Sequence, residues 1–129
     1  MKFKLSIILL SICLLSCKKS VFNYRHKYIG NWVITTTYNL WAGPTIDTTV
    51  TSTYKGKITY GDDENEIIIH NFQNSSLPIT VYTDGGLYEV DQGKCGLINK
   101  KTLTLVLKYY TPGSRTTYTI TGKKIKDLF

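Results

Sequence analysis

Residues 101–110, KTLTLVLKYY, decide the fold class of this chain. Their side chains alternate between an apolar and a polar face, formed by Leu103, Leu105 and Leu107 and by Thr102, Thr104 and Lys108 respectively. A period of two is typical of a half-buried β-strand, because successive side chains point to opposite sides of a sheet. The turn sequence Thr111-Pro112-Gly113-Ser114 follows and leads into a second strand at 116–121. We therefore expect an antiparallel pair of strands here.

The same alternation recurs toward the N-terminus. The first strand carries Trp32, Ile34, Thr36 and Tyr38 on one face, and further strands are predicted at 46–54, 57–60, 66–72, 79–83 and 87–91. Composition agrees, since the chain has 18 threonines, 10 tyrosines and a single alanine, and β-branched and aromatic residues favour strands. Seven or eight short strands indicate an all-β fold. We expect a small antiparallel up-and-down barrel, with a β-sandwich as the alternative.

The N-terminus has the pattern of a secretory signal. Lys2 and Lys4 precede an apolar run at 5–15, and Lys18-Lys19 ends it. The run is far shorter than the roughly 20 residues that a membrane-spanning helix needs. We expect residues 1–16 to be a signal peptide, residues 17–27 a tether and residues 28–129 one β domain.

Leu14-Leu15-Ser16-Cys17 resembles the lipobox of bacterial lipoproteins. The resemblance implies that the Cys17 sulfur carries diacylglycerol and that the chain is cut before Cys17. Two or three acyl chains anchor a protein stably to a membrane. The alternative is an ordinary signal peptide with a chance cysteine at its end.

The residues next to Cys17 bear on the localisation of the protein in the cell. The aspartate that retains lipoproteins in the inner membrane of enteric bacteria is absent, because Lys18 follows Cys17. The start Cys-Lys-Lys-Ser resembles that of many Bacteroidetes lipoproteins, and it lacks the acidic residues of their surface-export signals. These resemblances imply an outer-membrane lipoprotein that faces the periplasm.

A second resemblance concerns the β domain. Gly30-Asn31-Trp32 at the start of the first strand resembles the Gly-x-Trp signature of lipocalins and of small lipocalin-like lipoproteins. It implies that Gly30 lets the chain turn into the barrel and that Trp32 plugs its closed end. The family often stacks a late arginine on that tryptophan, and Arg115 is the only late arginine, placed before the last strand.

Charge and cysteine content exclude several classes of function. Loss of residues 1–16 removes Lys2 and Lys4 and leaves 14 basic and 9 acidic residues, a net charge of +5. Most basic residues are scattered, so no nucleic-acid partner is expected. Two groups of lysines are interpreted as turn and tail residues or as contacts for anionic lipid headgroups: Lys100-Lys101 and Lys123-Lys124-Lys126. Cys95 stands alone once Cys13 is removed and Cys17 is acylated, so no disulfide is expected.

No group of residues predicts catalysis. The acidic residues at 62–66 suit a turn as well as Ca²⁺ ligands and lack the spacing of an EF-hand. His70 is a lone strand histidine, and Cys95 beside Lys94 has no neighbouring histidine to activate it. We expect no enzyme activity, no metal site and no cofactor.

Two hypotheses of function remain. The first is a binding module that holds a small apolar ligand at the barrel mouth, with Trp41 and Tyr38 as contacts and an interior cavity lined by Tyr38, Ile34 and Leu105. The second is a protein-interaction, inhibitor or immunity-type module of the envelope, with a filled core and an exposed Trp41. Trp41 follows the first strand in a predicted loop, where it either contacts a ligand or partner or folds back onto the core.

Overall fold

The computed structural model describes residues 23–126. A short 3-10 helix precedes eight strands, with the bounds η1 Tyr24–Tyr28, β1 Gly30–Trp41, β2 Asp47–Tyr60, β3 Glu66–Phe72, β4 Ser75–Val81, β5 Gly86–Glu89, β6 Gly93–Ile98, β7 Thr102–Thr111 and β8 Ser114–Lys124. The lipobox and Cys17 lie outside the described residues, so acylation of Cys17 stays a prediction.

The eight strands form a closed antiparallel barrel. Each strand pairs with the next along the chain, and β8 returns to pair with β1. This sequential order is the up-and-down topology, and closure of the ring confirms the expected barrel over the β-sandwich.

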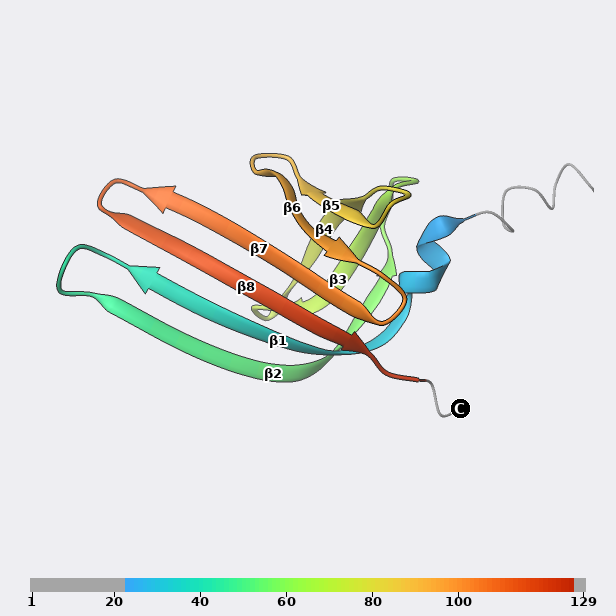
Figure 1. The fold of residues 1–129 in the computed structure, drawn as a ribbon, viewed down its shortest axis with the longest axis horizontal. Coiled ribbons are helices and arrows are strands. Elements are labelled where there is room, and N and C mark those ends of the chain that lie inside the picture. Colours follow the sequence, from blue (N-terminus) through green and yellow to red (C-terminus); the bar gives the residue numbers. More distant parts are fainter. Residues whose placement is uncertain (1–22, 127–129) are drawn as a thin grey trace, which may run out of the picture.

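The strands differ greatly in length, so only part of the molecule is a barrel. β2 pairs with β3 only over Ile58–Tyr60, and β7 pairs with β6 only over Leu103–Leu105. Beyond those pairs β2, β1, β8 and β7 continue alone, and Figure 1 shows their hairpins reaching far past the barrel. We call this part the extended sheet; it comprises residues 36–41, 47–52, 106–111 and 114–120.

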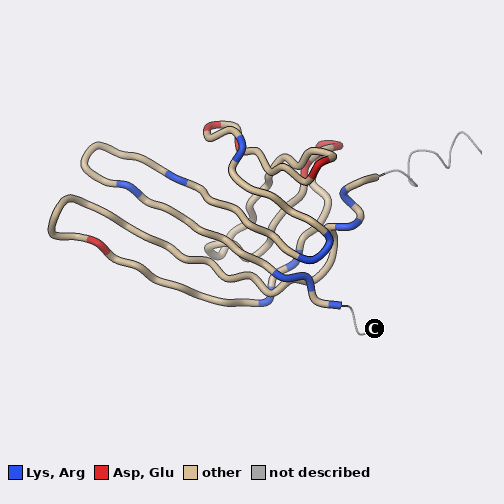
Figure 2. Tube along the Cα trace, viewed as in Figure 1, with Lys and Arg blue, Asp and Glu red and all other residues tan. Residues whose placement is uncertain are grey.

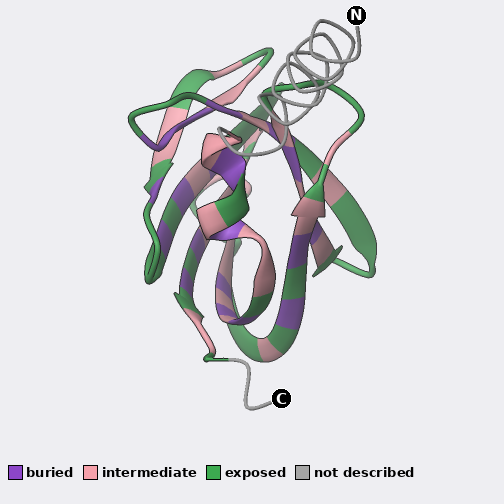
Figure 3. Cartoon of the chain, turned by 90° about the vertical axis from the view of Figure 1, so that its right-hand side faces the viewer, coloured by how far each residue is buried: buried purple, intermediate pink, exposed green. Residues whose placement is uncertain are grey.

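Side chains fill the barrel. Alternate strand positions point inward, as Figure 3 shows by the banding of buried residues along each strand. The fully enclosed members of this core are Trp32, Ile34, Ile58, Ile67, Ile69, Val81, Leu87, Leu105, Leu107 and Ile120, each 0% exposed. Each such side chain contributes about 1.5–3 kcal/mol on burial. Ile34 and Leu105, which would line a cavity under the first hypothesis, are therefore part of a filled core, as the second hypothesis expects.

Two of the strand predictions are wrong in opposite ways, so the predicted number of strands still agrees with the observed number. The strands expected at 46–54 and 57–60 are one strand, β2, because Gly56 continues it. A Cβ on Gly56 would lie 2.7 Å from Ile34 Cδ1, so the glycine makes room for the core and does not mark a break. β6, Gly93–Ile98, was not predicted, since its sequence GKCGLI contains two glycines and a lysine.

The N-terminal helix closes one end of the barrel. Tyr28 is buried there, and its carbonyl accepts a 2.9 Å hydrogen bond from Trp32 Nε1. Between them Gly30 has φ +136°, a conformation that favours glycine and lets the chain turn into β1. Gly30 thus lies at the turn into β1, and Trp32 is buried at the closed end beside Tyr28.

Candidate functional site

Four aromatic rings meet at the open end of the barrel. Tyr118 of β8 is the centre: its ring centroid lies 5.3 Å from that of Tyr38, 5.4 Å from Phe72 and 5.9 Å from Tyr109. The register explains the meeting, because Tyr38 of β1 and Leu107 of β7 are the cross-strand neighbours of Tyr118. Edge-to-face contacts at such distances are favourable for aromatic pairs.

A bulge in β3 brings the fourth ring, Phe72, into this cluster. Ile67 and Ile69 point into the barrel, so strict alternation would direct residue 71 inward and Phe72 outward. Asn71, at φ +64°, is an extra residue between the pairs His70–Ser76 and Phe72–Ser75. A β-bulge of this kind shifts the side-chain alternation by one. Phe72 therefore faces Tyr118.

A tight turn follows the bulge. Gln73 and Asn74 connect the paired residues Phe72 and Ser75, and both have positive φ, 50° and 59°. Two consecutive residues with positive φ form the type I′ turn that suits a hairpin. This turn projects the end of the β3–β4 hairpin toward the inner face of the extended sheet.

The space between the hairpin and the extended sheet is a groove of about 460 Å³. It is lined by Phe72, Gln73, Ser75, Ser76, Leu77, Tyr109, Thr116 and Tyr118. Ring faces and the Leu77 side chain supply apolar surface, whereas hydroxyls and an amide supply hydrogen-bonding groups. A few polar groups on a largely apolar lining are typical of sites for small ligands. We call this space the aromatic groove.

The phenols of the groove stay neutral over the physiological pH range. Burial raises the pKa of Tyr118, and the neighbouring phenol of Tyr38 raises it further. Burial also raises the pKa of Tyr109, with Glu89 as the next contributor. The groove thus offers neutral hydroxyl donors and no ionised phenol.

Two buried hydroxyl groups have no hydrogen-bond partner among residues 23–126. Thr36 Oγ1 and Tyr54 Oη are buried and unpaired. Thr36 is 2% exposed and lies on the inner face of β1 between Ile34 and Tyr38. It therefore marks the boundary between the packed interior and the aromatic cluster. An unpaired buried hydroxyl lowers the stability of the fold by about 1–3 kcal/mol, so packing alone does not explain a threonine at position 36.

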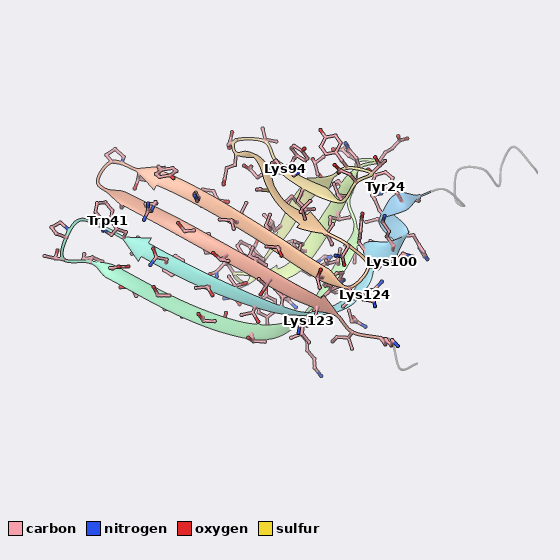
Figure 4. The ribbon with its side chains drawn as sticks, viewed as in Figure 1. Tyr24, Trp41, Lys94, Lys100, Lys123 and Lys124 are labelled. Atoms are coloured by element: carbon pink, nitrogen blue, oxygen red, sulfur yellow. The ribbon has the colours of Figure 1, made fainter. Side chains whose placement is uncertain are left out.

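The structure separates the two expected contact residues, Tyr38 and Trp41. Tyr38 is half-buried in the aromatic cluster on the inner face of β1. Trp41 is three residues further, so it points to the opposite, outer face of the sheet. It is 41% exposed, belongs to β1 itself and lies at the far tip of the extended sheet (Figure 4). Trp41 thus neither folds onto the core nor lines the groove.

Trp41 belongs to a row of exposed side chains on the outer face of the extended sheet. Asp47 and Arg115 are its cross-strand neighbours, and Tyr110, 69% exposed, is the neighbour of Arg115. Arg115 is therefore at the opposite end of the molecule from Trp32 and does not stack on it. The buried arginine of the closed end is Arg25, which sequence reasoning missed. It donates 2.8 Å hydrogen bonds to the carbonyls of Asp63 and Glu66.

The remaining reactive side chains have ordinary structural partners. Burial raises the pKa of Cys95 and the neighbouring Glu89 raises it further, so the thiolate is disfavoured. His70 Nε2 lies 2.7 Å from Thr59 Oγ1, and His26 Nδ1 lies 3.0 Å from Tyr60 Oη. Within residues 23–126 no group of three or more His, Cys, Asp or Glu side chains is placed to hold a metal ion.

In the described part of the chain, no helix has the length and the apolar character needed to cross a membrane.

Comparisons of the chain with models of known protein families, with curated proteins and with solved structures return no match.

Sequence reasoning found one residue of the groove cluster, Tyr38, and missed Phe72, Tyr109 and Tyr118 as site residues. The alternation signal placed Tyr118 on an inner face, together with Ile120. It could not place Phe72, because the bulge at Asn71 reverses the alternation. The pair Asn71 and Asn74 around Phe72 was the available signal, since asparagine tolerates positive φ.

Proposed function

We propose that this protein is a membrane-anchored lipoprotein whose lipocalin-like β domain binds a small ligand in the aromatic groove, without catalysis. The ligand has an apolar face, which stacks on Tyr118, Tyr109 and Phe72, and a polar edge, which reaches the hydroxyls of Ser75, Ser76 and Thr116. The observation that carries this proposal is the half-buried cluster of four rings around Tyr118 at the open end of a filled barrel.

The packed interior restricts what the ligand is. Ile34, Leu105 and Leu107 are 0% exposed, so the ligand lies across the barrel mouth and not deep inside it. A groove of about 460 Å³ matches one small molecule or a short stretch of a longer one.

The proposal also includes the membrane anchor and the localisation of the protein. The signal peptide, residues 1–16, directs export and is removed, and the acylated Cys17 then holds the domain at the periplasmic face of the outer membrane. Replacing Cys17 by alanine is expected to remove the acyl mass and to release the protein from membranes. Unchanged membrane fractionation of the variant would contradict the anchor.

The groove is tested with the apolar fluorophore N-phenylnaphthylamine and the full chain. Tyr118→Ala and Tyr109→Ala are expected to weaken binding of the fluorophore about tenfold each, because an aromatic contact contributes about 0.5–1.5 kcal/mol beyond its area burial. Trp41→Ala is the matched control on the outer face and leaves the affinity unchanged. Tyr109 is 45% exposed, so its variant keeps the fold if Tyr118→Ala does not.

A second function, docking on an envelope protein, rests on the outer-face row of Trp41, Arg115 and Tyr110. Tryptophan, tyrosine and arginine carry most of the binding energy at protein interfaces. The same variants separate the two functions. A protein partner captured by the parent chain and lost with Trp41→Ala, together with no effect of Tyr109→Ala on fluorophore binding, would replace the groove by this row.

A further inference from the structure

Lysines gather at one corner of the barrel, beside the closed end. The sheet register shows why they meet: Lys55 of β2 and Lys123 of β8 are both cross-strand neighbours of Val33. Neighbouring strands lie about 4.8 Å apart, so these two lysines are about 10 Å apart on the same outer face. Lys57 stands two residues beyond Lys55 on that face.

The turn between β6 and β7 adds two more lysines. The carbonyl of Lys101 accepts a 2.9 Å hydrogen bond from the amide of Lys124, which holds this turn against the end of β8. Figure 4 shows Lys100, Lys123 and Lys124 together, and Figure 2 shows basic residues concentrated in this region. We call the set the basic corner; its exposed members are Lys55, Lys57, Lys100, Lys101, Lys123 and Lys126.

The carboxylates of the described residues do not neutralise the basic corner. The acidic residues of the described chain lie in the turn at 62–66, near the β4–β5 and β5–β6 turns, and at the far tip, as Figure 2 shows. None of the six lysines forms an ion pair with a carboxylate within residues 23–126. Unpaired lysines of one sign on one face create a local positive potential that attracts an anionic surface.

A shallow hollow of about 390 Å³ lies within reach of these lysines on the outer face. Its lining includes Lys123 and threonines from three strands, Thr35, Thr102, Thr104 and Thr121. Hydroxyls beside an ammonium group suit the phosphate of a lipid headgroup, because they donate hydrogen bonds while the charge attracts the anion.

The chain path brings the basic corner to the membrane. Lys124 Nζ donates a 3.0 Å hydrogen bond to the carbonyl of Lys27 in η1, so the N-terminal segment leaves the domain next to the corner. At no more than about 3.6 Å per residue, a chain from Cys17 to Tyr24 reaches about 25 Å at most. An acylated Cys17 therefore keeps this end of the barrel close to the lipid surface.

From these observations we infer that the basic corner docks on an anionic phospholipid surface and turns the aromatic groove away from it. The docking orientation rests on the anchor of the proposed function. The attraction itself rests on the lysines alone. Each lysine that reaches an anionic leaflet strengthens binding about fivefold.

The test uses the full chain reconstituted in vesicles of phosphatidylcholine and of phosphatidylcholine with an equal amount of phosphatidylglycerol. Lysine acylation rates are read by mass spectrometry. Lys100, Lys101 and Lys123 are expected to react at least fivefold more slowly in the anionic vesicles, and high salt removes this protection. Exposed Lys94 and Lys108, remote from the corner, are internal controls whose rates do not change.

Variants then separate the orientation from the anchor. In the Cys17→Ala background, Lys100→Gln, Lys101→Gln and Lys123→Gln together are expected to weaken binding to the anionic vesicles about a hundredfold, whereas Lys94→Gln with Lys108→Gln leaves it unchanged. Flotation of the parent chain with both vesicles but equal acylation rates would overturn the docking and leave the anchor intact. Failure to float with phosphatidylcholine vesicles, with charge-dependent binding retained, would contradict the anchor alone. Binding of duplex DNA in place of anionic vesicles would overturn the docking.

Discussion

Thr36 shows how one residue can link stability to binding. Its hydroxyl is buried between the packed interior and the aromatic cluster and has no partner in the described part of the chain. Valine has nearly the same shape and removes only the unpaired polar group. Thr36→Val is therefore expected to raise the free energy of unfolding by about 1 kcal/mol, measured by urea denaturation.

Fluorophore binding supplies the second measurement on the same variant. If the Thr36 hydroxyl helps to hold a ligand, Thr36→Val weakens N-phenylnaphthylamine binding while it stabilises the fold. Thr36→Ser keeps the hydroxyl and serves as the control for binding. A less stable Thr36→Val protein would show that the hydroxyl is satisfied, and the argument from its cost would be wrong.

At the residue scale, sequence reasoning works where alternation is unbroken. Trp32, Ile34 and Leu105 were predicted to face inward and are 0% exposed. It fails at Asn71, whose positive φ inserts a bulge that no periodic pattern reveals. Because that bulge determines where Phe72 points, the composition of the groove could not be deduced without the structure.

Strand β2 is the element with the longest unpaired edge. From residue 47 to residue 57, β2 pairs only with β1, and no other strand of the described chain pairs with its opposite edge. The amide of Ala42 donates a hydrogen bond to the carbonyl of Ile46. This bond determines which residues of β2 direct their amides toward β1. Alternation then directs the amide of Ser52 to β1 and that of Thr51 to the open edge.

This alternation of amide directions predicts different effects for proline substitutions at two neighbouring positions of β2. Thr51→Pro removes an amide that no strand uses and loses the side-chain contact with Thr37, so it is expected to cost less than about 1 kcal/mol. Ser52→Pro removes a ladder bond to Thr36 and is expected to cost about 3 kcal/mol or more. Thermal unfolding monitored by circular dichroism compares them. Equal losses would mean that the edge at Thr51 is covered.

Glycines account for most of the differences between the predicted and the observed strands. Gly56 was interpreted as a break, yet it lies inside β2 because Ile34 occupies the space of its side chain. In β6, a Cβ on Gly96 would lie 2.1 Å from the carbonyl oxygen of Thr104, so the strands pack too closely for any side chain. Both glycines serve contacts between distant segments, which a single sequence does not display.

The stability of the whole molecule is expected to fall at alkaline pH. Burial raises the pKa of Tyr24, Tyr109 and Tyr118 above the ordinary value of 10.0. Above that pH the unfolded chain loses phenolic protons before the folded chain does. Their stabilising contribution is therefore complete below pH 10 and is lost as pH rises through the folded-state pKa values.

Urea unfolding below and above pH 10 measures this dependence. Tyr118→Phe is expected to reduce the loss of stability at high pH, because phenylalanine has no proton to lose. Tyr110→Phe, at a site that is 69% exposed, is the control and leaves the pH dependence of the parent chain. An identical slope for Tyr118→Phe and the parent would contradict the assignment of the effect to the aromatic cluster.

At the scale of the whole molecule, the barrel was predictable and its unequal shape was not. Eight strands with turn sequences between them favour sequential antiparallel pairing, and the ring closes in that order. Where the extended sheet leaves the barrel depends on how many residues pair at each junction, such as the three pairs between β2 and β3. Those numbers follow from packing across the molecule, so local patterns do not contain them.

The narrowest junction of the ring is that between β4 and β5, where only the pairs Thr80–Tyr88 and Val81–Leu87 join the two strands. β1 and β8, by contrast, pair over the whole range from Trp32 to Trp41. A ring opens first where the fewest bonds hold it, so we expect local opening of the barrel to begin between β4 and β5. The four long strands β7, β8, β1 and β2 are then the part of the ring that stays paired while β4 and β5 separate.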